Sequence, residues 1–288
     1  MSSLPATFKA DLRHPVGYKD PESKWFQWSS PAMIELSALD TYMFMESMIT
    51  YPGQRILEIG CGNGYLSLEL ARNGHDVTGI DMSQDIIKVA ERTWAVHRDP
   101  VGFGKLNYLC TNFDTWQAAK SSFDIVIFNR VLHHLADLQM TLAKVKHILR
   151  SGGLMICQDY AYDRLDYQTA SWMYQMQRLL FLSGLHDENP ASTPDDSRCI
   201  ETIRKAWHKR SLEHHLQHYE VMSLALQAIF YERFFTWTPY LFIYIGNGIR
   251  NARPEQEKEL LTFLKNMEQH MIEKDYMQAV GFRYAGTV

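Results

Sequence analysis

The sequence predicts an α/β protein built around a mostly parallel sheet. Between Gln54 and Asp159, short apolar runs alternate with amphipathic segments, which is typical of repeated strand–helix–strand units. Three glycines follow the first apolar run directly, and acidic residues stand at the ends of the first two runs. In such sheets ligands bind at the carboxyl ends of the strands, so these residues are the first candidates for a binding site.

The elements of this region follow from the length and period of each run. Strands are expected at "RILEIG", "DVTGID", "LNYLC", "FDIVIFN" and "LMICQDY". Helices are expected around Leu66 to Arg72, Gln84 to His97 and Leu138 to Leu149, and the segment Arg150 to Gly153 reads as a helix C-cap that turns into the fifth strand.

Different patterns flank the alternating region. Before it, "PESKWFQWSS" is rich in aromatic residues and Pro31 to Thr50 has helical spacing. After it, helices are expected from Arg164 to about Ser183, from Cys199 to about Ala228 and from Glu255 to Lys274, with strands at Phe230 to Trp237 and "VGFRYAG". The expected units are an N-terminal lid or extension (1–53), a core (54–159), a helical insertion or substrate cap (160–228) and C-terminal strands and helix that complete the sheet (229–288).

Composition limits the classes of partner. The chain has 288 residues, of which 46% are hydrophobic, and its net charge of -4 does not suggest a broad surface for nucleic acid. The N-terminus lacks an apolar signal segment, and the run "YLFIYIG" is far too short to span a bilayer, so a cytoplasmic protein is expected. The four cysteines form no C-x-x-C pair, and the three at strand ends, Cys61, Cys110 and Cys157, are expected to be small core residues.

The glycine loop favours a cationic ligand over a dinucleotide. Its glycines, Gly60, Gly62 and Gly64, do not follow the dinucleotide spacing G-x-G-x-x-G, and Glu58 precedes them. A carboxylate there would repel a pyrophosphate but would attract the ammonium and sulfonium of S-adenosylmethionine. Asp81 ends the next strand, where a carboxylate can accept the ribose hydroxyls, and Met82 follows where an adenine face can rest.

Four ordered segments, "LEIGCGNGYLSLELA", "VTGIDMSQDIIKVAER", "FDIVIFNRVLHHL" and "LRSGGLMICQD", resemble the class I S-adenosylmethionine-dependent methyltransferase family. The resemblance covers about 54–159. It implies a Rossmann-like fold with a seven-stranded, mostly parallel sheet, helices on both faces and a helical insertion after the fifth strand. It also implies S-adenosylmethionine as cofactor. The residues that it assigns to the cofactor are Glu58, Gly60, Cys61, Gly62, Gly64, Asp81, Met82, Asn112, Phe113 and Asn129. The aromatic "WFQWSS" and the helix rich in Met and Tyr after the fifth strand suggest a lid and a mostly apolar cavity, so a small organic acceptor, methylated at N or O, is expected.

Two of these residues need comment: Asn112 departs from the family pattern, and Asn129 is expected near the reactive end of the cofactor. Asn112 stands where the family often has an acid near the adenine amine; its amide oxygen can still accept a hydrogen bond, and the Phe113 backbone can donate one. Asn129 ends the fourth strand and is expected to face the reactive end of the cofactor.

Transfer to a hydroxyl or cationic amine needs a base, whereas the activated donor needs no catalytic triad. The leading candidates are His134 and Asp159, with packing or helix capping as the alternative for the two histidines of "LHHL". Tyr160 and Tyr162 are further candidates, as are His14 and Tyr18 if the N-terminal segment folds over the site.

Other patterns favour ordinary packing. His214 and His218 are four residues apart, but no acid or cysteine motif completes a metal site, so a solvated helix face and no metal are expected. The stripe Trp172, Met173, Met176, Leu179 and Leu180 is expected to pack the insertion against the sheet.

The remaining functional alternatives are a methyltransferase of protein or nucleic acid, a protein of this fold that uses S-adenosylmethionine without methyl transfer, and a dinucleotide-dependent oxidoreductase. The sequence does not indicate the oligomeric state.

Overall fold

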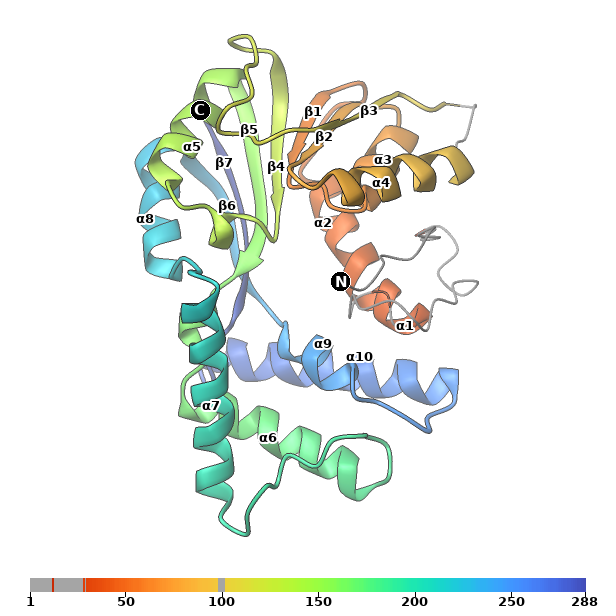
Figure 1. The fold of residues 1–288 in the computed structure, drawn as a ribbon, viewed down its shortest axis with the longest axis vertical. Helices are drawn as coiled ribbons and strands as arrows, with labels where there is room; N and C mark the ends of the chain where they lie inside the picture. Colours follow the sequence, from red (N-terminus) through yellow and green to blue (C-terminus); the bar gives the residue numbers. More distant parts are fainter. Residues whose placement is uncertain (1–11, 13–27, 29, 98–101) are drawn as a thin grey trace.

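The computed structural model describes residues 12, 28, 30–97 and 102–288 and contains a seven-stranded sheet. The strand order is β3-β2-β1-β4-β5-β7-β6, and Figure 1 shows the sheet in the upper half of the molecule. The strands are β1 (Arg55–Ile59), β2 (Asp76–Asp81), β3 (Lys105–Cys110), β4 (Phe123–Asn129), β5 (Leu149–Tyr160), β6 (Tyr231–Thr238) and β7 (Gly281–Thr287). The predicted sheet is confirmed, including the two C-terminal strands.

Strand direction creates a crevice in the middle of the sheet. Strands β1 to β5 pair in parallel, while β7 is antiparallel to both β5 and β6. The chain runs outward from β1 through β2 to β3 and then returns to place β4 on the other side of β1. Ile59 pairs with Phe128, so the residues that follow β1 and end β4 emerge side by side. This is the switch point at which open α/β sheets bind ligands.

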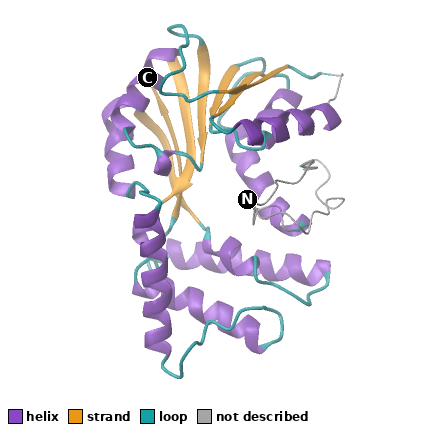
Figure 2. Cartoon of the chain, viewed as in Figure 1, coloured by secondary structure: helices purple, strands orange, loops and turns teal. Residues whose placement is uncertain are grey.

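Helices cover both faces of the sheet, as predicted, and Figure 2 shows them in purple around the orange strands. The helices of one face are α2 (Asp40–Ser47), α3 (Tyr65–Arg72) and α4 (Gln84–His97), which pack on Ile56, Ile125 and Ile127. The other face carries α5 (Leu138–Ile148) and α8 (Tyr219–Ile229), which pack on Leu57, Val126 and Met155. Alternate residues of a strand point to opposite faces, so β1 and β4 serve both layers. Helix α1 (Pro31–Met33) and the π-helix η3 (Ile34–Leu39) precede α2.

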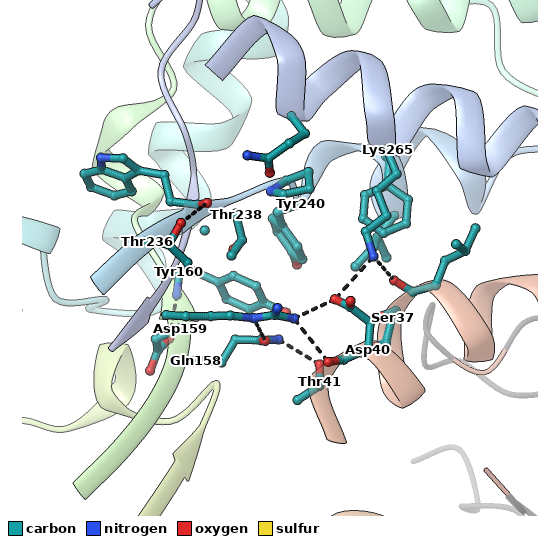
Figure 3. Close-up of a pocket in the computed structure, with 18 of the residues that line it drawn as sticks. Ser37, Asp40, Thr41, Gln158, Asp159, Tyr160, Thr236, Thr238, Tyr240 and Lys265 are labelled. Atoms are coloured by element: carbon teal, nitrogen blue, oxygen red, sulfur yellow. Dashed lines mark hydrogen bonds and ion pairs between the residues drawn. The ribbon is translucent and has the colours of Figure 1, made fainter. Parts of the chain in front are cut away.

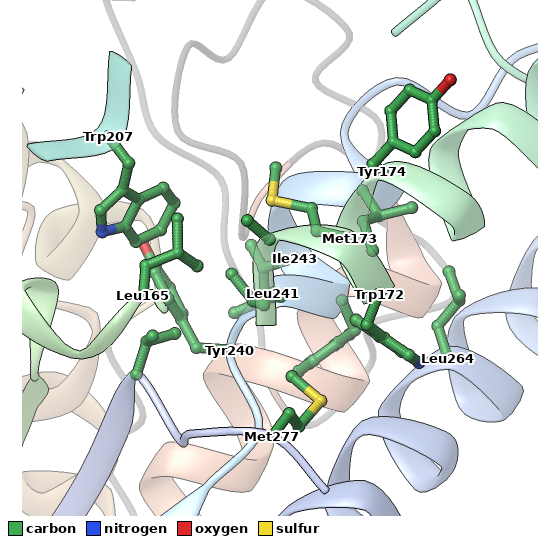
Figure 4. Close-up of a cluster of buried hydrophobic side chains, with 14 of the residues drawn as sticks. Leu165, Trp172, Met173, Tyr174, Trp207, Tyr240, Leu241, Ile243, Leu264 and Met277 are labelled. Atoms are coloured by element: carbon green, nitrogen blue, oxygen red, sulfur yellow. The ribbon is translucent and has the colours of Figure 1, made fainter. Parts of the chain in front are cut away.

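A second group of helices lies beyond the carboxyl ends of the strands (Figure 1). Its members are α6 (Tyr167–Leu182), α7 (Asp196–Glu213), α9 (Leu241–Gly246) and α10 (Pro254–Glu273), with the short helix η5 (Tyr162–Arg164) leading into them. Their apolar side chains form one buried cluster, in which Trp172 and Met173 of α6 lie close to Leu241 of α9 and Leu264 of α10 (Figure 4). The inserted helices therefore share a core with the C-terminal segment.

Four expectations about packing and element bounds are wrong in detail. The segment 150–153, expected as a helix C-cap, belongs to β5, because the strand already begins at Leu149. The helix expected over 199–228 is two helices, because His215 adopts a left-handed backbone with φ of 51° and ends α7 before α8 begins. His214 and His218 lie at opposite sides of that break, both exposed. Cys110 is exposed because it ends the edge strand β3. In the stripe on α6, Leu179 is 57% exposed whereas Trp172, Met173 and Leu180 are buried.

Among the described residues, the helices are too short or too polar to cross a bilayer. The described part of the chain also brings together no group of three or more histidine, cysteine or acidic side chains that could hold a metal ion.

Candidate functional site

A cavity of about 1000 Å³ opens at the carboxyl ends of β1, β2 and β4. We call it the main cavity. Every residue that the sequence assigned to the cofactor lines it except Gly64, namely Glu58, Gly60, Cys61, Gly62, Asp81, Met82, Asn112, Phe113 and Asn129. Its volume is at the upper end of the range for small-molecule sites, which leaves room for a cofactor and a second molecule.

The glycine loop requires glycine for two different physical reasons. Gly60, Gly62 and Gly64 all have positive φ, a conformation that costs other residues free energy. A Cβ at Gly60 would lie 2.5 Å from Val131 Cγ2, and a Cβ at Gly64 would lie 2.7 Å from Ala90 Cβ. A Cβ at Gly62 would meet nothing within 4 Å, so there the backbone angle alone demands glycine. Gly64 is therefore a packing residue that starts α3 rather than part of the cavity wall.

Glu58 is an acid held in a dry position beside the cavity. Its side chain is 1% exposed, and its carboxylate accepts a hydrogen bond from Ser67 Oγ. Burial, helped by the nearby charge of Asp81, raises the pKa of Glu58 to about 8. A cationic group in the main cavity would compensate this buried acid, as the ammonium of S-adenosylmethionine would.

Asn129 lines the same cavity and has one buried acceptor atom without a partner among the described residues. Its Nδ2 donates to the Tyr65 hydroxyl at 3.0 Å, whereas its buried Oδ1 has no hydrogen-bond partner among the described residues. Such an orphaned acceptor carries a free-energy cost that a ligand donor can remove. With Glu58, Asn129 makes this end of the cavity suited to an ammonium group.

The residues after β2 and β3 form the opposite end of the main cavity. Asp81 accepts from the Gly62 N–H at 3.1 Å and from the Ser83 N–H at 2.9 Å, and both oxygens retain a free lone pair for ligand hydroxyls. Met82 is 76% exposed and offers an apolar surface. Asn112 Oδ1 already accepts from the Asp114 N–H at 2.8 Å, so one lone pair remains for an amine.

The two candidate bases lie in very different surroundings. Asp159 is 1% exposed; it accepts from the backbone N–H groups of Val131 at 3.1 Å and Leu132 at 2.6 Å, and it is hydrogen-bonded to His133 Nδ1. It does not line the main cavity. This geometry disfavours Asp159 as a base, because its oxygens are engaged in fixing the loop after β4.

His134 is the candidate base that remains accessible. It ends the short helix η4 (Leu132–His134), is exposed and lines the main cavity. Partial burial and the adjacent His133 lower the pKa of His134 to about 4, so its imidazole is neutral near pH 7. His133, in contrast, is 3% exposed and bonded to Asp159, in line with the packing alternative for this pair.

Tyrosine side chains form the wall on the side of the inserted helices. Tyr160 ends β5 and Tyr162 begins η5, while Tyr240 is the N-cap of α9 and Tyr244 lies within it. All four side chains line the main cavity. Burial raises the pKa of each phenol, so these hydroxyls stay protonated and can donate hydrogen bonds rather than act as bases. His14 and Tyr18 lie outside the described residues.

The aromatic wall is anchored to the last long helix by a carboxylate. Glu268 of α10 is fully buried and accepts from the backbone N–H groups of Tyr240, Leu241 and Phe242 at 2.7, 2.8 and 2.8 Å. These donors belong to the start of α9, where backbone N–H groups have no partner within the helix. Glu268 thus fixes the position of α9, of Tyr240 at its N-cap and of Tyr244 within it.

Sequence reasoning missed several side chains of the cavity. Arg130 directly follows Asn129 within a segment that was already singled out, yet an arginine there matches no motif. Tyr65 starts α3 after the glycine loop and contacts the buried Trp28 edge-on at 4.8 Å. Tyr240 and Tyr244 carried no signal, because only the packing of α9 against α10 and α6 brings them to the site.

The comparisons with known proteins agree with this geometry. The family described as "Methyltransferase domain" matches residues 51–228. Ubiquinone biosynthesis O-methyltransferases of Ruegeria sp. (strain TM1040) and Cereibacter sphaeroides (strain ATCC 17025 / ATH 2.4.3) are each 32% identical over 146 and 162 residues, which cover 51% and 56% of this chain. The matched part spans 57% and 63% of the length of these relatives.

A solved structure extends the likeness to the whole fold. Geranyl diphosphate C-methyltransferase from Streptomyces coelicolor A3(2), in complex with S-adenosyl-L-homocysteine, has a TM-score of 0.58 at 13% identity, covering 96% of this chain and 87% of that one. At that identity the likeness concerns the fold alone. Because the family match covers more than half of the sequence and includes the glycine loop and Glu58, the chain belongs to the class I S-adenosylmethionine-dependent methyltransferases.

Proposed function

We propose that this protein transfers a methyl group from S-adenosylmethionine to a hydroxyl group of a small organic acceptor. The observation that carries the proposal is that the main cavity is lined by two groups suited to a cation. These are the buried acid Glu58 and Asn129, whose Oδ1 has no hydrogen-bond partner among the described residues. Both favour a ligand with an ammonium group, which stabilises the ionised form of Glu58.

The residues of the site would hold the cofactor along the carboxyl edge of the sheet. Glu58, Asn129 and the glycine loop would hold the amino-acid part, Asp81 the ribose, and Met82, Asn112 and Phe113 the adenine. When bound, S-adenosylmethionine supplies a methyl group that is already activated by its sulfonium. The chain then has to align the acceptor and exclude water.

We assign the role of base to His134. It is neutral near pH 7, because its pKa is lowered to about 4, and it faces the main cavity where an acceptor would lie. It can therefore take the hydroxyl proton during transfer, although its low pKa makes it a weaker base than an ordinary imidazole. Asp159 is a positioning residue, since it holds the loop that carries His134. The insertion, 160–228, and the N-terminal segment, 1–53, would enclose the acceptor.

The choice of oxygen over nitrogen is supported by the relatives. The matched proteins of Ruegeria and Cereibacter are named O-methyltransferases, and the tyrosine wall suits an aromatic or apolar acceptor. A net charge of -4 gives no support to a nucleic-acid acceptor. A protein acceptor, and use of the cofactor without methyl transfer, are the alternatives that the experiment must separate.

The proposal is tested first by thermal unfolding of the full chain with S-adenosylmethionine, S-adenosylhomocysteine, NAD or NADP. Stabilisation by the first two ligands alone is expected, since a ligand that binds the native state raises the unfolding temperature. Transfer of a radiolabelled methyl group from S-adenosylmethionine is then measured to phenols, to the anilines of matching structure and to a peptide library. Glu58→Gln should reduce the stabilisation, while Glu91→Gln, on the exposed face of α4, should leave it unchanged. Stabilisation by a dinucleotide would refute the proposal.

A further inference from the structure

A smaller cavity of about 230 Å³ adjoins the main cavity, and we call it the second cavity. Its walls come from η3 and α2, the end of β5, the segment after β6, and α9 and α10 (Figure 3). The two cavities share four lining residues, Arg130, Tyr160, Tyr240 and Ile243. A molecule in the main cavity is thus separated from the second cavity by single side chains.

Arg130 stands at this junction without a counter-ion. Its Nη2 donates to Ser37 Oγ at 3.1 Å and its guanidinium lies 5.7 Å from the centroid of the Tyr160 ring. Its Nε is buried and has no hydrogen-bond partner, and no ion pair with an acid is formed, among the residues that the structure describes. An arginine stays charged at all relevant pH values, so burial without a partner is costly.

The backbone at Arg130 is also unusual. Its φ is +61°, a left-handed conformation that is costly for a residue other than glycine, and its N–H donates to the Gln158 carbonyl at 2.7 Å. Strain of this kind concentrates at functional sites. Here the structure holds the guanidinium against Ser37, which lines only the second cavity.

The charge balance of the second cavity leaves a surplus of positive charge. Lys265 and Arg283 share one carboxylate, that of Asp40, at 3.2 and 2.5 Å (Figure 3 draws the Lys265 contact). The other carboxylate of the wall, that of Asp159, is hydrogen-bonded to His133 and to backbone N–H groups. Three cationic side chains therefore line a cavity with one available carboxylate, and Arg130 pairs with no acid of the described residues.

We propose that Arg130 binds an anionic group of the methyl acceptor, a carboxylate or a phosphate, at the junction of the two cavities. This inference rests on the proposed function and narrows the acceptor to an acid whose aromatic or apolar body lies along the tyrosine wall. Among the described residues only Nη2 of the guanidinium makes a side-chain hydrogen bond, so its other N–H groups can donate to the oxygens of such a group.

The cofactor has a carboxylate too, but it is a less suitable occupant. Glu58 and Asn129, which suit the cofactor's ammonium, belong to the main cavity alone, whereas the charged end of Arg130 is bonded to a residue of the second cavity. The acceptor is the ligand that can reach from one cavity into the other.

The test uses the full chain saturated with S-adenosylhomocysteine and three probes: benzoate, phenyl phosphate and neutral benzyl alcohol. Calorimetric titration is carried out on the unchanged protein, on Arg130→Met and Arg130→Lys, and on Arg198→Met, an exposed arginine of α7, as the matched control. Benzoate or phenyl phosphate should bind at least about tenfold more weakly to Arg130→Met, whereas benzyl alcohol should bind equally to all four proteins. Arg130→Lys keeps the charge but loses the fork, so it should give an intermediate affinity.

A second readout needs no acceptor probe. Because Arg130 is buried and pairs with no acid in the described part of the chain, Arg130→Met should unfold at the same or a higher temperature than the unchanged protein. Added phosphate should stabilise the unchanged protein but not this variant. If Arg130→Met fails to fold, the affinities of Arg130→Lys for benzoate and phenyl phosphate, compared with those of the unchanged protein, test the proposal instead.

Two results would overturn the proposal. If Arg130→Met binds S-adenosylhomocysteine more weakly but binds the anions equally well, Arg130 belongs to the cofactor site. The second is the absence of anion binding by the unchanged protein. Failure of the unchanged protein to bind S-adenosylhomocysteine would refute the proposed function, while the anion titration of the cofactor-free protein would still decide the role of Arg130.

Discussion

Cofactor binding should be coupled to the loss of a proton from Glu58. Burial raises the pKa of Glu58 to about 8 in the cofactor-free protein, so the side chain is mainly protonated at neutral pH. An ammonium group beside it favours the ionised form and lowers this pKa in the complex. Binding of S-adenosylhomocysteine therefore releases a proton, and affinity rises as pH rises toward the pKa of the free site.

The size of the effect follows from that pKa. A carboxyl with a pKa of about 8 is ionised to about 1% at pH 6 and to about 10% at pH 7. The dissociation constant should therefore fall about tenfold over this unit of pH, which corresponds to about 1.4 kcal/mol. His134 adds nothing to this slope, because its lowered pKa of about 4 keeps it neutral throughout.

Isothermal titration at three pH values between about 6 and 7, each in two buffers of different ionisation enthalpy, measures both the slope and the released proton, about 0.9 per ligand at pH 7. Glu58→Gln should bind more weakly and show a flat profile, while Glu91→Gln should behave like the unchanged protein. A pH-independent affinity of the unchanged protein, or an equal slope in Glu58→Gln, would refute the reasoning.

Three further outcomes are expected. His134→Gln should lower kcat without changing the affinity for S-adenosylhomocysteine. Because the pKa of His134 is lowered to about 4, kcat of the unchanged enzyme should not fall near pH 6.5. A kcat that titrates near pH 6.5 would contradict this role. Asp159→Ala should destabilise the protein by about 3 kcal/mol or more, since it removes the acceptor of His133 and of three backbone N–H groups. A free energy of urea unfolding within about 1 kcal/mol of that of the unchanged protein would count against this role. Glu268→Ala should lower the free energy of unfolding by about 3 kcal/mol or more, because it removes the acceptor of three buried N–H groups. Glu268→Gln should have a stability between that of Glu268→Ala and that of the unchanged protein. Equal urea midpoints for the two variants would show that the carboxylate does not anchor α9.

The cofactor side of the site could be predicted from the sequence because its residues are local to strand ends. In a parallel sheet the position after each strand is set by the apolar run before it, so Glu58, Asp81 and Asn129 follow from the strand pattern alone. The exception is Gly64, whose absent side chain makes room for Tyr108 and Ala90 rather than for a ligand.

The acceptor side could not be predicted in the same way. Tyr240 and Tyr244 lie on a short apolar run whose period does not distinguish a cavity wall from a core, and only contacts with α10 bring them to the sheet. The pairing of Asp159 with His133 joins residues 26 positions apart through the loop after β4, a geometry that no spacing rule contains. The break at His215 was missed because neither glycine nor proline marks it.

Because Glu268 anchors α9, the cofactor side and the acceptor side of the site depend on different parts of the sequence. Residues for the cofactor come from the first half of the sequence, whereas the tyrosine wall is held from α10, close to the C-terminus. Substitutions in α10 that shift α9 would reshape the acceptor side and leave the glycine loop untouched. New acceptor preferences could therefore arise by drift in one C-terminal helix, without any loss of the methyl donor during the change.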